Sequence, residues 1–309
     1  MTENPNFKSG FVTLVGRPNV GKSTLVNALL NQKVAAVSPR PQTTRRRQLG
    51  ILTLPDAQIV FMDTPGMHKP HYKLGDLMNE AAEETLMDAD VIVFMVDAAL
   101  PPDEEDRLAA EKLAALRGSP PQILAINKID LVPPEALPAR EQLYRDLAPQ
   151  ALPISLSAVT NQNTQQLLDA ILERLPIHPP FYDEEQITDL YEREIAADLI
   201  REAALIHLRE EIPHALAVRI DEFAERTTDQ AYIAATLFVE RDSQKGIVIG
   251  QRGEMLKKIG STARKEIETM SGRKVFLELR VKVAKNWRND ANALRQFGFS
   301  RPDPGEKGK

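Results

Sequence analysis

The stretch Gly16-Arg17-Pro18-Asn19-Val20-Gly21-Lys22-Ser23 decides how the first half of this chain folds. It matches the pattern GxxxxGKS and lies between an apolar run, Phe11–Val15, and a helical pattern, Leu25–Leu30, which is the context that a phosphate-binding loop requires. Glycine at positions 16 and 21 lets the backbone wrap closely around phosphate oxygens, with its amides and the positive end of the helix facing the anion. We therefore expect Gly16 to Thr24 to bind a nucleotide, with the Lys22 ammonium on the β- and γ-phosphates and the Ser23 hydroxyl on Mg²⁺.

Around this loop, up to Leu175, short apolar runs alternate with stretches whose apolar residues recur at three- and four-residue spacing. The runs are Phe11–Val15, Ile59–Met62, Val91–Val96, Gln122–Ile126 and Leu152–Ile154, and the helical stretches are Ser23–Leu30, Leu74–Asp88, Glu104–Leu116, Leu137–Leu147 and Thr164–Leu175. Strands alternating with helices predict an α/β fold with a doubly wound, mostly parallel sheet. Ligands of such sheets bind beyond the carboxyl ends of the strands, so the loops that follow the apolar runs are the place to look for chemistry.

A second motif, Asp63-Thr64-Pro65-Gly66, follows the apolar run Ile59–Met62. At the end of a strand, the Asp63 carboxylate is placed to hold Mg²⁺, and the Gly66 amide is placed to contact a γ-phosphate and to lose it on hydrolysis. By itself the tetrapeptide would suit an ordinary Pro-Gly turn. Its position after a strand and downstream of the phosphate loop favours nucleotide binding for all four residues.

A third motif, Asn127-Lys128-Ile129-Asp130, follows the run Gln122–Ile126 and indicates which base is bound. The Asp130 carboxylate can accept hydrogen bonds from the N1 and N2 hydrogens of guanine, and adenine lacks this pair of donors. Ser157-Ala158, after a later strand, can close over the guanine O6 with a backbone amide. The predicted base contacts are therefore Asn127, Lys128, Asp130, Ser157 and Ala158.

The segment from Pro41 to Arg47, which reads PQTTRRR, lies where the first switch loop of a nucleotide hydrolase belongs. One of its threonines should complete the Mg²⁺ shell with Ser23 and Asp63; we prefer Thr44, although the sequence does not separate it from Thr43. The three arginines suit a solvated or partner-binding loop better than a catalytic arginine. The predicted catalytic groups are Lys22, Thr44 and Gly66.

The proline-rich segment Pro176-Ile177-His178-Pro179-Pro180 ends the alternating pattern, because closely spaced prolines cannot continue a helix. We expect a G domain over residues 1–176, a linker over 177–181, a smaller α+β domain over 182–301 and a polar tail over 302–309. In the smaller domain we expect a helix over Asp189–Arg209 and strands around Ala217–Phe223 and Tyr232–Glu240. The clearest strand has the apolar residues Val275, Leu277, Leu279, Val281 and Val283 alternating with Phe276, Glu278, Arg280 and Lys282.

Between these strands lies a glycine-punctuated stretch, Gly246 to Gly253, which we expect to form a turn before an amphipathic helix. Gly250-Gln251-Arg252-Gly253 has the GxxG pattern with which KH domains clamp a nucleic-acid backbone, and Lys257 and Lys258 follow on the helix. A lone GxxG is usually only a turn. The apolar residues before it, the basic helix after it and the alternating strand that follows make an RNA-binding site the better interpretation.

Composition is compatible with both predicted domains. The chain is 42% apolar and 27% charged, as in globular proteins, and has no cysteine, which excludes disulfides and thiol catalysis and fits a reducing cytosol. The formal net charge of −5 conceals a division. Acidic side chains dominate from Asp183 to Asp242 and basic ones from Lys245 to Arg301, an asymmetry that suits a polyanionic partner as well as ordinary solvated helix faces.

The motifs GRPNVGKST, QTTR, DTPG, NKID and SA, in this order, resemble those of the TrmE–Era group of translation-factor-related GTPases. The resemblance implies GTP hydrolysis without the glutamine that orients water in Ras-like proteins, because Met67 and His68 follow Gly66 here. It also implies that Asn19 helps to hold K⁺ in place of an arginine finger, with slow intrinsic turnover.

The GxxG unit and the segment Val281 to Arg288 resemble the branch of this group that carries a C-terminal KH domain, the Era type. That resemblance implies binding to the 3′ end of 16S ribosomal RNA and a role in maturation of the 30S subunit. It also implies a cytoplasmic monomer with some peripheral association with the inner membrane surface. Trp287 could stack on a base, but a lone tryptophan more often packs at a domain edge.

Two other functions fit the sequence less well. A tRNA-modification GTPase of this group would carry a reactive C-terminal cysteine, which the chain lacks, and would place its G domain inside a helical domain. An RNA-binding module with a degenerate G domain conflicts with the intact Lys22, Ser23, Asp63 and Asp130.

Overall fold

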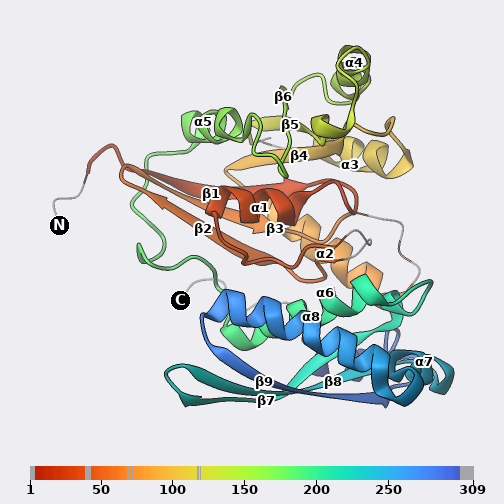
Figure 1. The fold of residues 1–309 in the computed structure, drawn as a ribbon. Coiled ribbons are helices and arrows are strands. Elements are labelled where there is room, and N and C mark those ends of the chain that lie inside the picture. The colour runs from red at the N-terminus through yellow and green to blue at the C-terminus, as the bar shows by residue number, and fades with distance from the viewer. Residues whose placement is uncertain are drawn as a thin grey trace. The chain divides into compact units, whose positions relative to one another are not determined.

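The computed structural model describes residues 4–38, 43–67, 70, 72–116, 118 and 120–299. The described residues divide into two compact units (Figure 1). The first takes its residues from 1–35, 44–69 and 78–189, and the second from 36–43, 70–77 and 190–309. Among the residues named in the predictions, Pro41, Gln42, His68 and the polar tail lie outside the described residues.

The sheet of the first unit has the strand order β2-β3-β1-β4-β5-β6. Its strands are β1 (Lys8–Val15), β2 (Gln48–Leu54), β3 (Ala57–Asp63), β4 (Val91–Asp97), β5 (Gln122–Asn127) and β6 (Leu152–Ser155). All neighbouring strands run parallel except β2, which pairs antiparallel with β3. The predicted doubly wound, mostly parallel sheet is confirmed. The sequence patterns do not predict β2, which Pro55 and Asp56 join to β3; so short a connection permits only an antiparallel pair.

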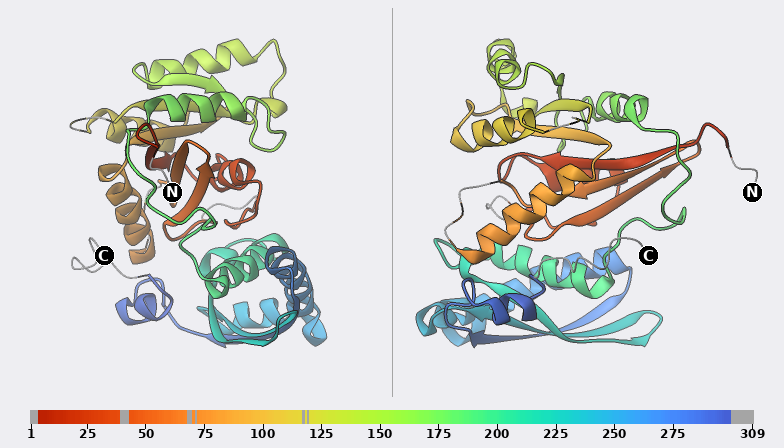
Figure 2. Two further views of the ribbon diagram at one scale, coloured as in Figure 1. Left: turned by 90° about the vertical axis from the view of Figure 1, so that its left-hand side faces the viewer. Right: turned by 180° about the vertical axis from the view of Figure 1, so that it is seen from behind.

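Helices cover both faces of this sheet (Figure 2). They are α1 (Lys22–Leu30), α2 (Lys73–Met87), α3 (Glu104–Ala114), α4 (Leu137–Leu147) and α5 (Thr164–Arg174). Alternate residues of β4 show why two layers form. Val91, Val93 and Met95 join an apolar core with α1 and α5. Ile92, Phe94 and Val96 point the other way, into a core shared with α2, α3 and α4.

The second unit is a smaller α+β fold with helices on one face of a three-stranded sheet. Strand β7 (Ala217–Thr227) pairs antiparallel with β8 (Gln230–Val239), and β8 pairs parallel with β9 (Lys274–Val283). The apolar faces of the long helices α6 (Glu192–His207) and α8 (Glu254–Ser271) pack on this sheet. Shorter elements complete the unit: the helices α7 (Asp242–Ile249) and α9 (Ala291–Gln296) and the 3₁₀ turns η2 (Pro213–Ala215) and η3 (Gln251–Gly253).

The glycine-punctuated stretch differs in part from its prediction. Gly246 to Ile249 are helical and complete α7, so the turn comprises only Gly250 to Gly253. The burial of Val248 explains the difference. Its side chain is fully buried in the core of the second unit, and this packing stabilises the stretch as part of the helix.

The proline-rich segment lies within the first compact unit, which ends at Asp189 rather than at the predicted linker. The His178 amide donates to the Phe7 carbonyl, and the Ser9 hydroxyl donates to the Pro179 carbonyl at 2.6 Å. The Gln58 side chain, in β3, accepts from the amides of Phe181 and Tyr182. These bonds hold the segment along the first unit, and the predicted domain limits stay a prediction. Within the described part of the chain, no helix combines the length and the apolar character that crossing a membrane requires.

Candidate functional site

The phosphate loop connects the end of β1 to the start of α1 and leaves no room for side chains at its glycines. A Cβ atom on Gly16 would lie 2.2 Å from the Met95 carbonyl oxygen, and one on Gly21 would lie 2.3 Å from Asn127 Nδ2. Gly21 also has a φ of 104°, in the left-handed region. The backbone therefore turns tightly here and brings the start of α1 to the carboxyl edge of the sheet.

Lys22 begins α1 and folds back over the loop. Its Nζ donates to the carbonyl oxygens of Gly16 and Arg17, each at 3.0 Å, and only 6% of the residue is exposed. Burial lowers its pKa to about 8, against the opposing effect of Asp63. The ammonium group is thus held against the loop, and the phosphates of a bound nucleotide would raise its pKa again.

The three predicted Mg²⁺ ligands converge on one point. Ser23 Oγ lies 2.8 Å from Thr44 Oγ1 and donates to Asp63 Oδ2 at 2.6 Å, and the Thr44 hydroxyl lies 3.2 Å from the same oxygen. The second oxygen, Asp63 Oδ1, is buried and receives no hydrogen bond from the described residues. Burial raises the pKa of Asp63, while the Ser23 hydroxyl opposes that rise. Of the two candidate threonines, Thr44 is the one whose hydroxyl is seen bonded in this cluster.

The DTPG segment lies directly against the phosphate loop. The Thr64 hydroxyl donates to the Leu14 carbonyl at 2.8 Å, and the Met67 amide donates to the Gly16 carbonyl. A Cβ on Gly66 would lie 2.5 Å from the nitrogen of Pro18, so only glycine fits this approach. The side chain of Met67 is buried in the apolar core, which places no polar group at the position where Ras-like proteins hold a glutamine.

Asn127 ties the base-binding loops to the phosphate loop. Its Nδ2 donates to the Val20 carbonyl at 2.7 Å, and its Oδ1 accepts from the Ala158 amide at 2.9 Å. Asp130, the residue predicted to contact the base, lies in the 3₁₀ turn η1 (Ile129–Leu131) and is exposed. Ser157 is buried, and its hydroxyl accepts from the Thr160 amide. One side chain thus ties the phosphate loop to the loop that carries Ala158.

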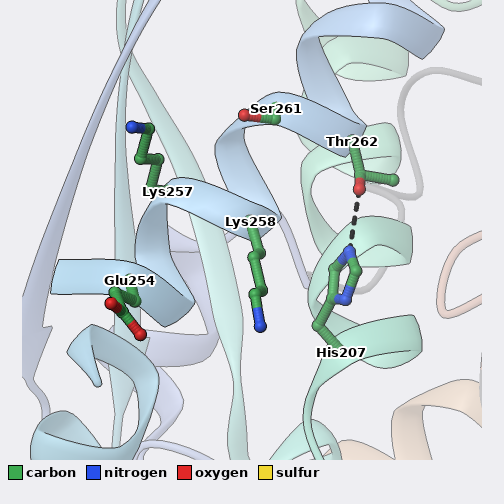
Figure 3. A pocket seen from close by; sticks show the side chains of 6 residues that line it. All are labelled: His207, Glu254, Lys257, Lys258, Ser261 and Thr262. Carbon is green, nitrogen blue, oxygen red and sulfur yellow. Dashed lines mark hydrogen bonds between the residues drawn. The ribbon is translucent and has the colours of Figure 1, made fainter. Parts of the chain in front are cut away.

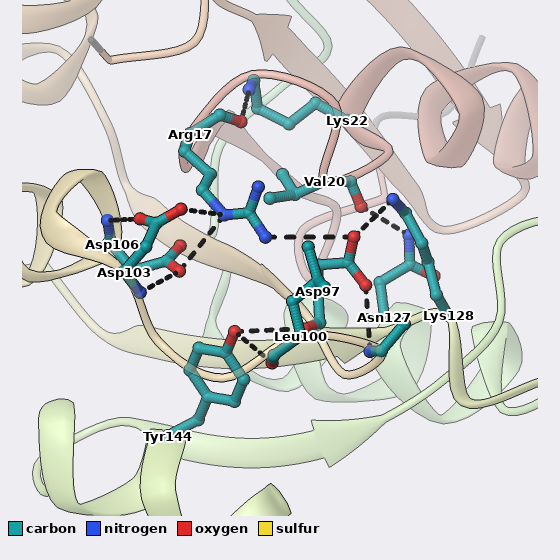
Figure 4. Close-up of polar contacts among 11 residues, drawn as sticks. Arg17, Val20, Lys22, Asp97, Leu100, Asp103, Asp106, Asn127, Lys128 and Tyr144 are labelled. Carbon is teal, nitrogen blue, oxygen red and sulfur yellow. Dashed lines mark hydrogen bonds and ion pairs between the residues drawn. The ribbon is translucent and has the colours of Figure 1, made fainter. Parts of the chain in front are cut away.

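An acidic cluster that the sequence does not predict lies beside the nucleotide site (Figure 4). The sequence places Arg17 among the nucleotide-binding residues, but its guanidinium turns away from the loop toward Asp97, Asp103 and Asp106. Asp97 also accepts from Lys128 Nζ at 2.6 Å. The spacing of Asp103 and Asp106 at the start of a helical pattern was an available signal for a helix cap, although not for its partner.

The second unit contains a groove that would suit single-stranded nucleic acid. Gly250 and Gly253 have φ values of 72° and 83°, and the exposed Arg252 lies between them at the start of α8. A hollow of about 410 Å³ continues from this turn between α8 and β9. It has an apolar floor and a basic rim, formed by Gly253, Leu256, Lys257, Gly260, Ser261, Arg264, Leu277 and Leu279. Of the predicted RNA-binding lysines, Lys257 lines this groove and Lys258 does not.

Lys258 faces a second hollow instead, of about 490 Å³, at the end of α6 (Figure 3). There the His207 ring lies 2.8 Å, Nε2 to Oγ1, from the Thr262 hydroxyl. Lys257 and Ser261 border both hollows. Trp287 takes no part in either, because it is fully buried and donates to the Ala215 carbonyl at 2.8 Å. Packing is therefore its role, rather than base stacking.

A guanine-nucleotide site at the carboxyl edge of a doubly wound sheet, followed by a GxxG fold, defines a GTPase with a KH domain. Family models agree: one described as a 50S ribosome-binding GTPase matches residues 11–128, and one for the KH domain matches residues 211–288. A crystal structure of Era in complex with MgGDPNP and nucleotides 1506–1542 of 16S ribosomal RNA is 40% identical, with a TM-score of 0.90. The match covers 96% of this chain and 100% of that one.

A structure of an Aquifex aeolicus Era variant bound to GDP·AlF4⁻ is 39% identical over the same shares of both chains, again with a TM-score of 0.90. The chain belongs to the Era family of GTPases. It is an enzyme that hydrolyses GTP to GDP, as the sequence predicted, and the KH domain is confirmed as its second part.

Proposed function

We propose that this GTPase is a molecular switch that binds the 3′ end of 16S ribosomal RNA through its KH domain and acts in assembly of the 30S subunit. The apolar groove between α8 and β9, bordered by the GxxG turn and by basic side chains, carries the proposal. KH domains clamp about four nucleotides in such a groove. The similar Era complex with 16S ribosomal RNA indicates which RNA to test.

In this proposal the G domain binds GTP with Mg²⁺. Ser23, Thr44 and Asp63 supply the hard oxygen donors that Mg²⁺ prefers, and the buried Asp63 Oδ1 is an acceptor that such an ion would satisfy. The bound ion would neutralise charge on the β- and γ-phosphates. Lys22 and the Gly66 amide would hold the γ-phosphate, and Asp130 would select guanine.

Residues that lie close to Thr44 and Gly66 in sequence belong to the second compact unit. Residues 36–43, which lead into Thr44, belong to the second compact unit, where the Val37 amide donates to the Glu202 carboxylate of α6 at 3.1 Å. Residues 70–77, which follow the DTPG loop, also belong to that unit. There the Leu74 amide donates to the Arg288 carbonyl. We therefore propose that a rearrangement at the γ-phosphate alters the contacts that residues 36–38 and 72–77 make in the RNA-binding unit.

A binding experiment tests the proposal. The affinity for an RNA of nucleotides 1506–1542 would be measured with GDP and with GDPNP, beside a scrambled RNA of equal length. We expect a preference for the rRNA sequence and different affinities in the two nucleotide states. Equal affinities would remove the switch, since a ligand shifts an equilibrium only through differential binding. Equal affinities for the rRNA sequence and the scrambled RNA would contradict the proposal that 16S ribosomal RNA is the partner.

A pair of charge-matched variants locates the contact. Arg252→Asp, in the GxxG turn, should weaken RNA binding strongly and leave the intrinsic GTPase rate unchanged. Arg295→Asp, which makes the same charge change at an exposed position on α9, should have little effect. Equal losses in the two variants would show that only net charge matters.

We also propose that K⁺ stimulates hydrolysis. Asn19 lies in the phosphate loop with a φ of 65°, and buried Met67 supplies no polar group near the γ-phosphate. Replacing Na⁺ by K⁺ should raise the turnover number of the wild type and have a smaller effect on Asn19→Ala.

Family membership further leads us to propose a cytoplasmic monomer that associates peripherally with the inner membrane surface. Cosedimentation with vesicles of anionic lipid, and molar mass in solution, would test those two points.

A further inference from the structure

The Arg17 side chain leaves the phosphate loop and reaches the start of α3 (Figure 4). Its Nε lies 3.2 Å from Asp106 Oδ2 and 3.3 Å from Asp103 Oδ2, and one terminal nitrogen lies 3.9 Å from Asp97 Oδ2. Only 11% of the side chain is exposed. Burial opposes the charge, but the three carboxylates outweigh it and raise the pKa of Arg17, so this cation is permanent.

The carboxylates that hold Arg17 are themselves fixed. Asp103 Oδ1 accepts from the Asp106 amide at 3.0 Å, and Asp106 Oδ2 accepts from the Asp103 amide at 3.2 Å. This reciprocal capping box begins α3, whose apolar side packs in the core of the first unit. The guanidinium is therefore attached to a rigid helix end rather than to a loop.

The backbone of Arg17 contacts two groups that act on the γ-phosphate. Its carbonyl oxygen accepts from Lys22 Nζ at 3.0 Å. A Cβ on Gly66 would lie 2.9 Å from the Arg17 carbonyl carbon and 2.5 Å from the Pro18 nitrogen, so Gly66 packs on the peptide that joins these residues. A displacement of that single peptide would move both Lys22 and Gly66.

We propose that Arg17 is a positioning residue for GTP hydrolysis, which anchors the first turn of the phosphate loop to α3 and so sets the places of Lys22 and Gly66. The inference rests on the γ-phosphate roles proposed above for those two residues. Arg17 contributes through its backbone carbonyl and through the anchorage of its side chain, and the guanidinium itself does not reach the phosphates.

The same anchor extends to the base-binding side of the site. Asp97 receives both the Arg17 guanidinium and, at 2.6 Å, the ammonium of Lys128. The Tyr144 hydroxyl donates to the carbonyls of Asp97 and Leu100 and fixes the loop between them. Because Tyr144 also holds the loop that carries Asp97, the partner of Lys128, loss of Arg17 should affect the γ-phosphate end of the site more than guanine binding.

The test compares Arg17→Gln with Arg107→Gln, an exposed arginine of α3. For Arg17→Gln we expect the turnover number to fall by roughly 10- to 100-fold, as small misplacements of reacting groups do, with GDP affinity changed less than threefold. Arg107→Gln should retain wild-type turnover. If Arg17→Gln only lowers the melting temperature and its folded fraction turns over normally, the residue stabilises the fold and the proposal is wrong.

A second variant guards against misfolding. Asp103→Ser keeps an oxygen to cap α3 but removes a carboxylate beside Arg17, so it should fold and still slow turnover by several-fold. Arg17→Gln combined with Asp106→Asn should be no slower than Arg17→Gln alone, because both changes break one attachment; additive losses would contradict the proposal. Lys22→Ala tests the γ-phosphate role of Lys22 separately from the positioning role of Arg17. Full turnover in that variant would contradict the proposed role of Lys22, on which the inference about Arg17 depends.

Discussion

The hydroxyl oxygens of Ser23 and Thr44 lie 2.8 Å apart, and both are within hydrogen-bonding distance of the same carboxylate oxygen of Asp63. These residues come from α1, the first switch region and the end of β3, so only the folded chain brings them together. Thr43, one residue away, is not among the partners of Asp63 in this cluster. The geometry distinguishes two threonines that the sequence leaves equivalent.

We expect Thr44→Val to raise the Mg²⁺ concentration needed for half-maximal GTP turnover and to reduce the maximal rate at least about tenfold, because a ligand to the metal is lost. Thr43→Val should behave as the wild type. Turnover measured against Mg²⁺ concentration gives both quantities. A larger defect in the Thr43 variant would assign the metal to the other hydroxyl.

Asp130→Asn should weaken GTP binding by roughly 10- to 150-fold, because the hydrogen bonds lost involve a charged acceptor. The same change should improve binding of xanthosine triphosphate, whose base has a carbonyl where guanine has its amino group and so accepts from the new amide. Asp169→Asn, on the exposed side of α5, serves as the control. Competition binding of the two nucleotides measures the exchange of preference; unchanged selectivity would remove Asp130 from the base site.

The affinity for GDP should decrease as the pH rises through 8. Burial lowers the pKa of Lys22 to about 8 in the nucleotide-free protein, whereas bound phosphates favour the charged ammonium. Binding above that pH therefore takes up a proton, and the affinity should fall by at most about tenfold per pH unit. Titrations between pH 6.5 and 9.5 would show this, and Lys22→Gln should bind weakly with a flat profile.

The lowered pKa of Lys22 also affects the stability of the nucleotide-free protein. Its unfolded state keeps the ordinary lysine pKa of 10.5, so between pH 8 and 10.5 the unfolded chain binds more protons than the folded one. This group's contribution to the free energy of unfolding therefore rises with pH across that window. A contribution that falls there would contradict the assignment of a lowered pKa to Lys22.

Gly260→Val should block the KH groove without unfolding the domain. A Cβ at this position would lie 3.3 Å from a methyl group of Leu279, a side chain of the groove floor, so the added bulk occupies the space where a base would lie. We expect RNA affinity to fall roughly tenfold, the effect of losing one stacked base. Unaltered RNA binding in this variant would place the RNA elsewhere.

Gly246→Ala is the control, because the added Cβ in α7 meets no described atom within 4 Å beyond its chain neighbours and the backbone of its own helix. It should leave RNA binding unchanged and raise the free energy of unfolding by about 0.4–1 kcal/mol, since alanine restricts the unfolded chain. Isothermal denaturation of both variants would separate a blocked groove from a damaged fold.

Trp287→Phe should destabilise the second unit while leaving its RNA affinity intact. The substitution removes the hydrogen bond to the Ala215 carbonyl and leaves that buried acceptor unsatisfied, at a cost of about 1–3 kcal/mol. Thermal unfolding followed by circular dichroism measures the loss. A fall in RNA affinity at a temperature where the variant is fully folded would restore base stacking as a role for Trp287.

Much of the fold follows from local patterns. The alternating run Val275 to Val283 and the apolar run Val91–Val96 predict β9 and β4, because burial requires apolar side chains at the period of a strand. The run Gln48–Leu54 was missed, since its strand is defined by pairing with β3 rather than by alternation. Likewise, Gly246 to Ile249 looks like a turn in sequence, but burial of Val248 extends the helix.

By itself, the sequence determined which motifs this protein carries: the phosphate loop in Gly16 to Ser23, the NKID motif that predicts guanine selection by Asp130, and the GxxG stretch from Gly250 to Gly253 that predicts RNA binding. Such motifs are legible because backbone wrapping and hydrogen-bond complementarity impose residue types at fixed short spacings. Only the tertiary structure decided that Thr44 faces Ser23, that Arg17 turns to α3, and that the groove lies between α8 and β9. Those relationships join residues far apart along the chain, and their distances depend on how buried strands and helices pack rather than on any local pattern.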